Sequence, residues 1–288
     1  MRNVTRTKLE KARPMAFLFE SDLEVELHEN ENPGLGVHSV QVLSEMLKEV
    51  RREGAYAGQP PVDFILSNGD TDARFEETYK HLWKPLESLC PSYHVMGNHE
   101  GGYFERDGNK WREYLGYEET YYALEYSAPE ATVTFIVLDT WCSWDEDGVL
   151  RINEGSGKQA FRDEQKEWLK RMLDQAPGLT LVFAHGHVWT PNCRHQDNEA
   201  MDELIDILKG TYEEGTIHKP ANAFFNGGHH DYPDCNKVDG VTFIDPIGAI
   251  HKGYARVIVD PIKKKMDYLG RFNEKSYRGL DLTGYPEN

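Results

Sequence analysis

The stretch at 93–100, YHVMGNHE, combines side chains that could do chemistry with a glycine that can present them. A short apolar run stops at Gly97, and Asn98, His99 and Glu100 follow at once. Glycine allows close backbone approach, the amide is a neutral oxygen ligand, and the imidazole is a ligand or a proton donor. On its own the motif fits a polar turn after a buried strand equally well, so the rest of the chain has to decide.

The same arrangement, an apolar run that ends in residue types able to bind metal, recurs along the chain. Taken singly, each of these residues fits a helix cap, a turn or a hydrogen-bonded histidine. Taken together they predict one site, because the strands of an α/β sheet present their carboxyl ends at a common edge. The candidate ligands are Asp22, Asp70, Asn98 with His99, His185, and His229 with His230 and Asp231.

Carboxylate, imidazole and amide ligands in one site suit Mn²⁺, Fe or Zn²⁺ better than Ca²⁺ or a thiolate-preferring ion. Two such ions ~3.5–4 Å apart can clamp a phosphate and hold a bridging hydroxide at neutral pH. Asp70 is a natural bridging ligand, because a carboxylate has lone pairs for two metals. His99 could then protonate the leaving oxygen or stabilise charge on the phosphoryl group.

The elements that position these residues alternate between strand and helix, which predicts an α/β fold with buried sheet strands. Short apolar runs predict the strands, and apolar residues at helical spacing predict the helices. Pro85 must begin or kink a turn of its helix. The expected strands lie at 16–19, 62–66, 94–96, 120–126, 132–138, 179–184, 223–225, 241–244 and 255–260, and the expected helices at 39–52, 75–89, 159–175 and 199–209.

We expect a single domain over 1–288, because no repeat, low-complexity tract or linker divides the chain. Its core is expected at about 16–260 and a polar tail at 261–288. The region 101–157 is typical of an insertion that could close over the site as a lid. Loops are expected at 34–38 and 143–157.

The formal net charge of −17 disfavours a protein that wraps long nucleic acid. A small phosphorylated substrate stays compatible, since bound cations reverse the local field. No apolar run approaches the ~18 residues that cross a bilayer, and the basic segment 1–14 lacks an apolar signal region. The four cysteines form no CxxC pair and are expected to be free thiols. A cytoplasmic protein without a membrane partner is therefore expected, and composition leaves its oligomeric state open.

The ordered motifs resemble the motif series of the calcineurin-like metallophosphoesterases over about residues 16–260. The matching segments are Asp22, Gly69-Asp70, Gly97-Asn98-His99-Glu100, His185 and Gly228-His229. The resemblance implies a four-layer sandwich of two mixed β-sheets flanked by helices, with a dinuclear metal site at its edge. It also implies a set of roles: Asp22 binds one ion, Asp70 bridges, Asn98, His185 and His229 bind the other ion, and His99 assists the leaving group.

Within that superfamily the chain is most similar to the branch that contains the manganese-dependent ADP-ribose/CDP-alcohol diphosphatases. The shared features are the turn at 97–100, the long insertion up to Leu138-Asp139, and the glycine-rich loop before the helix that carries Trp168. This similarity implies Mn²⁺ and a nucleoside diphosphate conjugate.

Two positions depart from the superfamily pattern. The first motif is usually Asp-x-His, whereas here Glu24 stands in place of the histidine, either as a variant ligand or as an acceptor that supports one. The last motif is usually Gly-His-x-His, and here Asp231 falls where the second histidine is expected, directly after His230. The added oxygen ligands would favour Mn²⁺ or Mg²⁺. Alternatively, the site is weakened or half-occupied.

The predicted function is metal-dependent hydrolysis of a small phosphodiester, nucleoside diphosphate conjugate or phosphomonoester by a metal-bridging hydroxide. Arg74 could contact phosphate or pair with Glu76 or Glu77. His187 could touch the substrate from the loop that carries His185. The alternative is a catalytically degenerate fold that binds one metal ion or a partner protein without turnover, and the number of bound metal ions separates the two.

Overall fold

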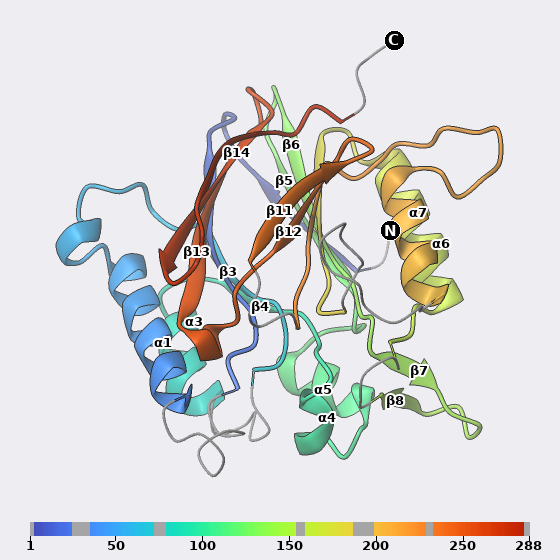
Figure 1. Cartoon of the computed structure of the whole chain (residues 1–288), viewed down its shortest axis with the longest axis horizontal. Helices are drawn as coiled ribbons and strands as arrows, with labels where there is room; N and C mark the ends of the chain where they lie inside the picture. The colour runs from blue at the N-terminus through green and yellow to red at the C-terminus, as the bar shows by residue number, and fades with distance from the viewer. Residues whose placement is uncertain are drawn as a thin grey trace.

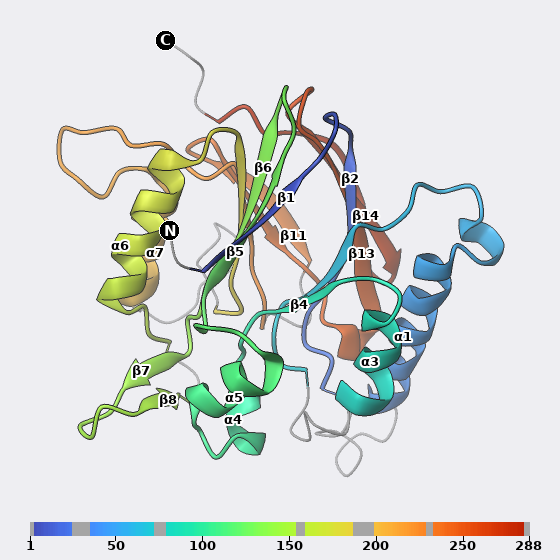
Figure 2. The same cartoon turned by 180° about the vertical axis from the view of Figure 1, so that it is seen from behind.

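The computed structural model describes residues 3–24, 35–71, 79–153, 159–186, 199–228 and 233–284 (Figure 1). Two mixed β-sheets pack face to face, and helices cover the outer face of each sheet (Figures 1 and 2). The predicted α/β fold with two mixed sheets flanked by helices is therefore confirmed.

Sheet A, in the described part of the chain, has the strand order β1-β5-β6-β9-β10-β12-β11. Its central strands β6, β9, β10 and β12 run parallel to one another, so their carboxyl ends lie at one edge. The bounds are β1 Val4–Lys8, β5 Tyr122–Ser127, β6 Thr132–Val137, β9 Leu179–Phe183, β10 Ala223–Phe225, β11 Asp234–Val238 and β12 Val241–Asp245.

Sheet B has the order β15-β14-β13-β2-β3-β4 over the same described ranges. β2, β3 and β4 are parallel, whereas β13 pairs antiparallel with both β2 and β14. The bounds are β2 Met15–Glu20, β3 Phe64–Ser67, β4 Ser92–His94, β13 Gly253–Asp260, β14 Lys265–Phe272 and β15 Tyr277–Asp281.

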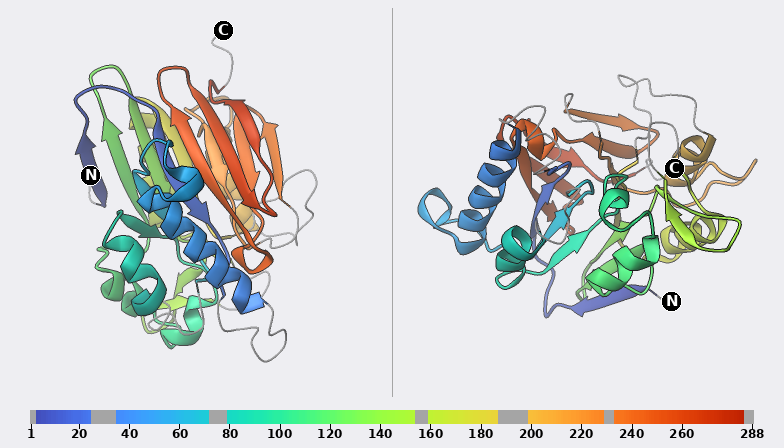
Figure 3. Two further views of the ribbon diagram at one scale, coloured as in Figure 1. Left: turned by 90° about the vertical axis from the view of Figure 1, so that its left-hand side faces the viewer. Right: turned by 90° about the horizontal axis from the view of Figure 1, so that it is seen from below.

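Three hydrophobic clusters hold the layers together, and the two-residue period of the strands distributes side chains among them. In β2, Phe17 and Phe19 face the other sheet, whereas Leu18 faces the helices. Phe17 stacks on Phe64 with ring centroids 4.8 Å apart. The outer clusters pack α6 (Asp163–Gln175) and α7 (Glu199–Lys209) on sheet A, and α1 (Leu35–Arg51) and α3 (Lys84–Glu87) on sheet B (Figure 3).

A smaller group of elements lies outside the two sheets, beside the turn after β4. It consists of α4 (Glu100–Tyr103), α5 (Gly108–Leu115) and the antiparallel pair β7 (Cys142–Trp144) and β8 (Leu150–Ile152). Its buried cluster includes Met96, Trp111 and Trp141. Along the chain, α4 and α5 come before β5, and β7 and β8 come after β6, whereas β5 and β6 themselves belong to sheet A. The idea that this region closes over the site stays a prediction.

Four expectations about the elements were wrong. The first helix begins at Leu35, inside the expected loop at 34–38. The third strand ends at His94 and does not cover the apolar run at 94–96. The expected loop at 143–157 contains most of β7 and all of β8. The expected polar tail at 261–288 contains β14 and β15, whose half-exposed faces hide their strand character.

Two further sequence features can be compared with the described residues. Among these residues, no helix is both long and apolar enough to span a bilayer. Cys90, Cys142 and Cys235 are free thiols, as expected, and Cys193 lies outside the described residues.

Candidate metal centre

The loops that follow β2 and β3 lie side by side and are joined by backbone hydrogen bonds. The N–H of Asp22 donates to the carbonyl of Gly69 at 3.0 Å, and the N–H of Glu24 donates to the carbonyl of Asp70 at 3.1 Å. Asp22, Glu24 and Asp70 all adopt positive φ angles, of 56°, 36° and 53°. Such angles are costly for residues with a Cβ and often occur at functional sites, where the surroundings hold them in place.

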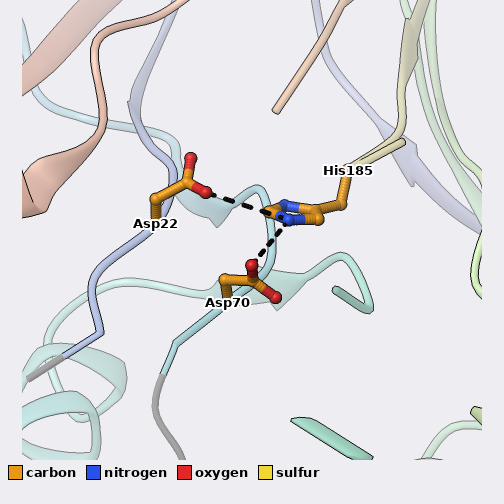
Figure 4. A group of neighbouring side chains, drawn as sticks. All are labelled: Asp22, Asp70 and His185. Carbon is orange, nitrogen blue, oxygen red and sulfur yellow. Dashed lines mark ion pairs between the residues drawn. The ribbon is translucent and has the colours of Figure 1, made fainter. Parts of the chain in front are cut away.

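Asp22, Asp70 and His185 meet at the carboxyl ends of β2, β3 and β9 (Figure 4). One ligand atom from each lies within 4.8 Å of the others, and all three residues are buried. Nε2 of His185 is 2.9 Å from Oδ2 of Asp70 and 3.8 Å from Oδ1 of Asp22. The three residues therefore converge as expected, but the expectation of a single sheet was wrong, because β2 and β3 belong to sheet B and β9 to sheet A.

The tautomer of His185 is set by its other ring nitrogen, which lies 2.6 Å from the carbonyl oxygen of Asn68. A carbonyl only accepts, so Nδ1 carries the proton and Nε2 faces the two carboxylates, as in a histidine that binds metal. Burial by itself lowers the pKa of His185, but the charges of Asp70 and Asp22 outweigh it and raise the pKa to about 10. Without metal, a second proton on Nε2 thus supplies positive charge between the carboxylates. A divalent cation fits the same position.

A second group of three ligand atoms, from Glu24, Asp70 and His99, also lies within 4.8 Å. The N–H of His99 donates to Oδ1 of Asp70 at 2.9 Å, and its Nε2 is 3.8 Å from Oδ2. Burial raises the pKa of Asp70, but the charges of His185 and His99 outweigh this effect and lower it overall. Asp70 is common to both groups, as a bridging ligand has to be.

Glycines provide the close approach that this packing requires. A Cβ on Gly69 would lie 2.7 Å from Nδ1 of His185, and the φ of Gly69 is +92°. A Cβ on Gly97 would overlap the carboxylate and the backbone nitrogen of Asp70. At both positions a side chain would displace a candidate ligand.

Several predicted residues lie outside the described part of the chain, namely Arg74, His187, His229, His230 and Asp231. The residue before His229 is described: the N–H of Gly228 donates to Oδ2 of Asp22 at 3.2 Å. The loop that leads into His229 therefore begins at the metal centre. Asn98 is half-buried in the turn between Gly97 and His99. The resemblance assigns Asp22 to one ion and His185 to the other. In the structure both lie in one group with Asp70, so which ligand binds which ion stays a prediction.

Two supporting residues had no role in the predicted site. The buried Glu100 carboxylate accepts hydrogen bonds from backbone N–H groups on two loops. The side-chain Nδ2 of Asn68 donates to the carbonyls of Ala184 (3.2 Å) and Asn226 (2.6 Å), which follow β9 and β10. Asn68 thereby ties sheet B to sheet A at the metal centre. The only feature of the sequence that pointed to Asn68 and Glu100 was their position next to the motif residues.

The fold and this candidate centre fit an α/β metal-dependent hydrolase, and a family comparison shows the class. Residues 15–213 match the family model described as calcineurin-like phosphoesterase. The chain belongs to that family and is therefore a metal-dependent phosphoric ester hydrolase, which favours the enzyme over the degenerate alternative. No curated protein sequence matches the chain significantly.

Solved structures share the fold at low sequence identity. A dimetal phosphatase from Danio rerio is 18% identical with a TM-score of 0.64, over 92% of this chain and 99% of that one. GAP50, the anchor in the inner membrane complex of Plasmodium, is 11% identical with a TM-score of 0.57, over 93% and 89%. The purple acid phosphatase PPD1 from yellow lupin seeds is 10% identical with a TM-score of 0.57, over 94% and 54%.

Proposed function

We propose that the protein hydrolyses a small phosphodiester or nucleoside diphosphate conjugate with the help of two divalent cations, most favourably Mn²⁺. The observation that carries this proposal is the position of Asp70 in both groups of candidate ligands. One carboxylate shared by two ligand groups suits a dinuclear site better than a mononuclear one. Glu24 in place of the usual histidine makes the site richer in oxygen, which supports Mn²⁺.

The ligands proposed for the two cations are Asp22, Glu24, Asp70, Asn98, His185 and His229, with His230 or Asp231 completing the set. Bound divalent cations would neutralise the phosphoryl oxygens and lower the pKa of a water molecule. The described residues fit such cations, because two buried carboxylates face Nε2 of His185 and need positive charge between them.

His99 is the proposed general acid. Its backbone N–H is fixed to Asp70, while its side chain is 37% exposed and can reach a substrate. A proton on Nε2 can pass to the oxygen of the leaving group, which otherwise departs as an unstable anion. That nitrogen lies 3.8 Å from Oδ2 of Asp70, so the ring stands beside the carboxylate proposed to bridge the two cations.

The substrate class rests on the sequence. The net charge of −17 disfavours long nucleic acid. The similarity to the ADP-ribose/CDP-alcohol diphosphatase branch favours a nucleoside diphosphate conjugate, and a phosphomonoester is the second candidate. We propose Arg74 and His187 as phosphate contacts, and the expected cytoplasmic location suits a small metabolite.

The test is hydrolysis by protein stripped with EDTA and then supplied with Mn²⁺, Mg²⁺, Zn²⁺ or Fe²⁺. The substrates are bis-p-nitrophenyl phosphate, p-nitrophenyl phosphate, ADP-ribose and a CDP-alcohol. We expect Mn²⁺ to restore diesterase activity and His99→Ala to lower kcat by about 10²–10⁴-fold. His218→Ala is the matched control, since this histidine stacks on Tyr212 and pairs with Glu213 at the surface. Full activity of His99→Ala would rule out the proposed general acid.

A further inference from the structure

Glu100 is a fully buried carboxylate to which the proposed reaction gives no part. Its Oε2 accepts from the N–H of Gly97 at 2.8 Å and from the N–H of Asp70 at 3.2 Å. Its Oε1 accepts from the N–H of Thr71 at 2.8 Å. One carboxylate thus satisfies three backbone donors that have no strand partner.

These donors belong to two different loops. Asp70 and Thr71 follow β3, whereas Gly97 follows β4. The regular pairing of the two parallel strands ends at Ser67 and His94, with one more bond from the N–H of Val95 to the carbonyl of Ser67. Beyond that point the hydrogen bonds to the Glu100 carboxylate take the place of strand pairing and hold the two loops at a fixed separation.

Only a carboxylate matches this arrangement. All three partners are donors, so the group between them must accept at both of its ends. An amide of the same size would turn an NH₂ group toward at least one backbone N–H and leave it unsatisfied in a buried place.

We propose that Glu100 is a positioning residue that fixes the distance between Asp70 and the turn carrying Asn98 and His99, and thereby sets the metal affinity. The proposal rests on the proposed function, since it concerns the same centre. It assigns Glu100 no contact with metal or substrate. The N–H of His99, which donates to Oδ1 of Asp70, is the second tie between the same loops.

The test compares wild type with Glu100→Gln, which keeps the size, and with Glu100→Asp, which keeps the charge but is one methylene shorter. Glu113→Gln is the control, because it removes the same charge from an exposed position on α5. Mn²⁺ is titrated calorimetrically into EDTA-stripped protein. Hydrogen exchange is followed in the metal-free protein by mass spectrometry, on peptides covering 69–71 and 95–100.

Replacing groups that orient metal ligands typically costs 10–100-fold in metal affinity, and we expect that loss for Glu100→Gln. We also expect both peptides to lose protection in this variant, and not in Glu113→Gln. Should Glu100→Gln fail to fold, Glu100→Asp is expected to show a smaller loss in the same direction. Affinity and protection equal to wild type in the folded variant would overturn the positioning role.

The same experiment separates the two proposals. If wild type binds no Mn²⁺ at all, the proposed function fails, and the exchange data still decide the role of Glu100. If wild type binds Mn²⁺ and Glu100→Gln matches it in both affinity and protection, only the positioning role fails.

Discussion

Gly227, in the loop after β10, leaves room for the imidazole of His185. A Cβ there would lie 2.8 Å from Nδ1 of His185 and 2.9 Å from both Nδ2 of Asn68 and Oγ of Ser21. The φ of Gly227 is outside the left-handed region, so the backbone itself tolerates alanine. The strain in Gly227→Ala would therefore come from these three contacts.

The size of the effect follows from the overlap. An ordinary Cβ contact begins at 3.4 Å, so the nearest atom has to move by about 0.6 Å. That atom is the ring nitrogen that donates to the carbonyl of Asn68 at 2.6 Å, and movement breaks this bond or turns Nε2 away from Asp70. Overpacking of this kind costs about 1–3 kcal/mol of stability. Loss of the bond that orients a metal-binding histidine costs about 10–100-fold in metal affinity.

The assay is calorimetric titration of Mn²⁺ into EDTA-stripped Gly227→Ala, with urea unfolding of the same sample. Gly58→Ala is the control, because no atom lies within 4 Å of a Cβ at that position. We expect the weaker binding and the lower stability in Gly227→Ala alone. Wild-type affinity in a Gly227→Ala protein that folds would refute the idea that close packing sets the position of His185.

Three further predictions concern stability. Buried Glu49 pairs with Arg256 (3.0 Å) and Arg271 (3.1 Å), so Glu49→Gln should lower the free energy of unfolding by about 3–5 kcal/mol. Urea unfolding measures this loss, and Mn²⁺ affinity should stay unchanged. An unchanged urea midpoint would contradict the prediction. Burial raises the pKa of Asp245 to about 7, whereas the carboxyl of the unfolded chain loses its proton above about pH 4. The proton held by folded Asp245 therefore favours the folded state at low pH, and this stabilisation is lost as pH rises from about 4 to 7. Asp245→Asn should therefore gain stability over wild type at pH 7.5 relative to pH 5, and a constant difference would argue against the shift. Removing metal with EDTA should lower Tm. The loss corresponds to about 2.7 kcal/mol for each bound ion when the starting Mn²⁺ concentration is 100 times its Kd, and an unchanged Tm would count against a bound metal.

The elements that the sequence predicted well are those buried on both faces. β2 and β9 are apolar at almost every position, so they stand out without knowledge of their partners. β14 was missed because only Met266 and Tyr268 of its eight residues are buried, and its other positions resemble a polar tail. β7 and β8 have three residues each, too few for a periodic pattern. Their pairing depends on contacts across a hairpin.

The candidate site likewise contains residues that the sequence could bring together and residues that it could not. Asp22 and Asp70 could be expected together, because β2 and β3 are parallel neighbours in sheet B. His185 follows β9 of sheet A, so its approach depends on how the two sheets pack against each other, which the order of strands does not reveal. The approach of Glu24 to Asp70 and His99 could not be expected from the strand positions, because it depends on a left-handed backbone at Glu24. The contacts of Glu100 depend on where three backbone N–H groups point, which residue types do not reveal.

The most direct test of the metal centre is the number of Mn²⁺ ions bound by EDTA-stripped protein, measured together with its diesterase rate. We predict two equivalents in wild type, activity that rises with occupancy, and loss of both ions' tight binding in Asp70→Asn, because that carboxylate serves both ligand groups. At most one equivalent in wild type, or two tightly bound equivalents in Asp70→Asn, would contradict a dinuclear centre bridged by Asp70.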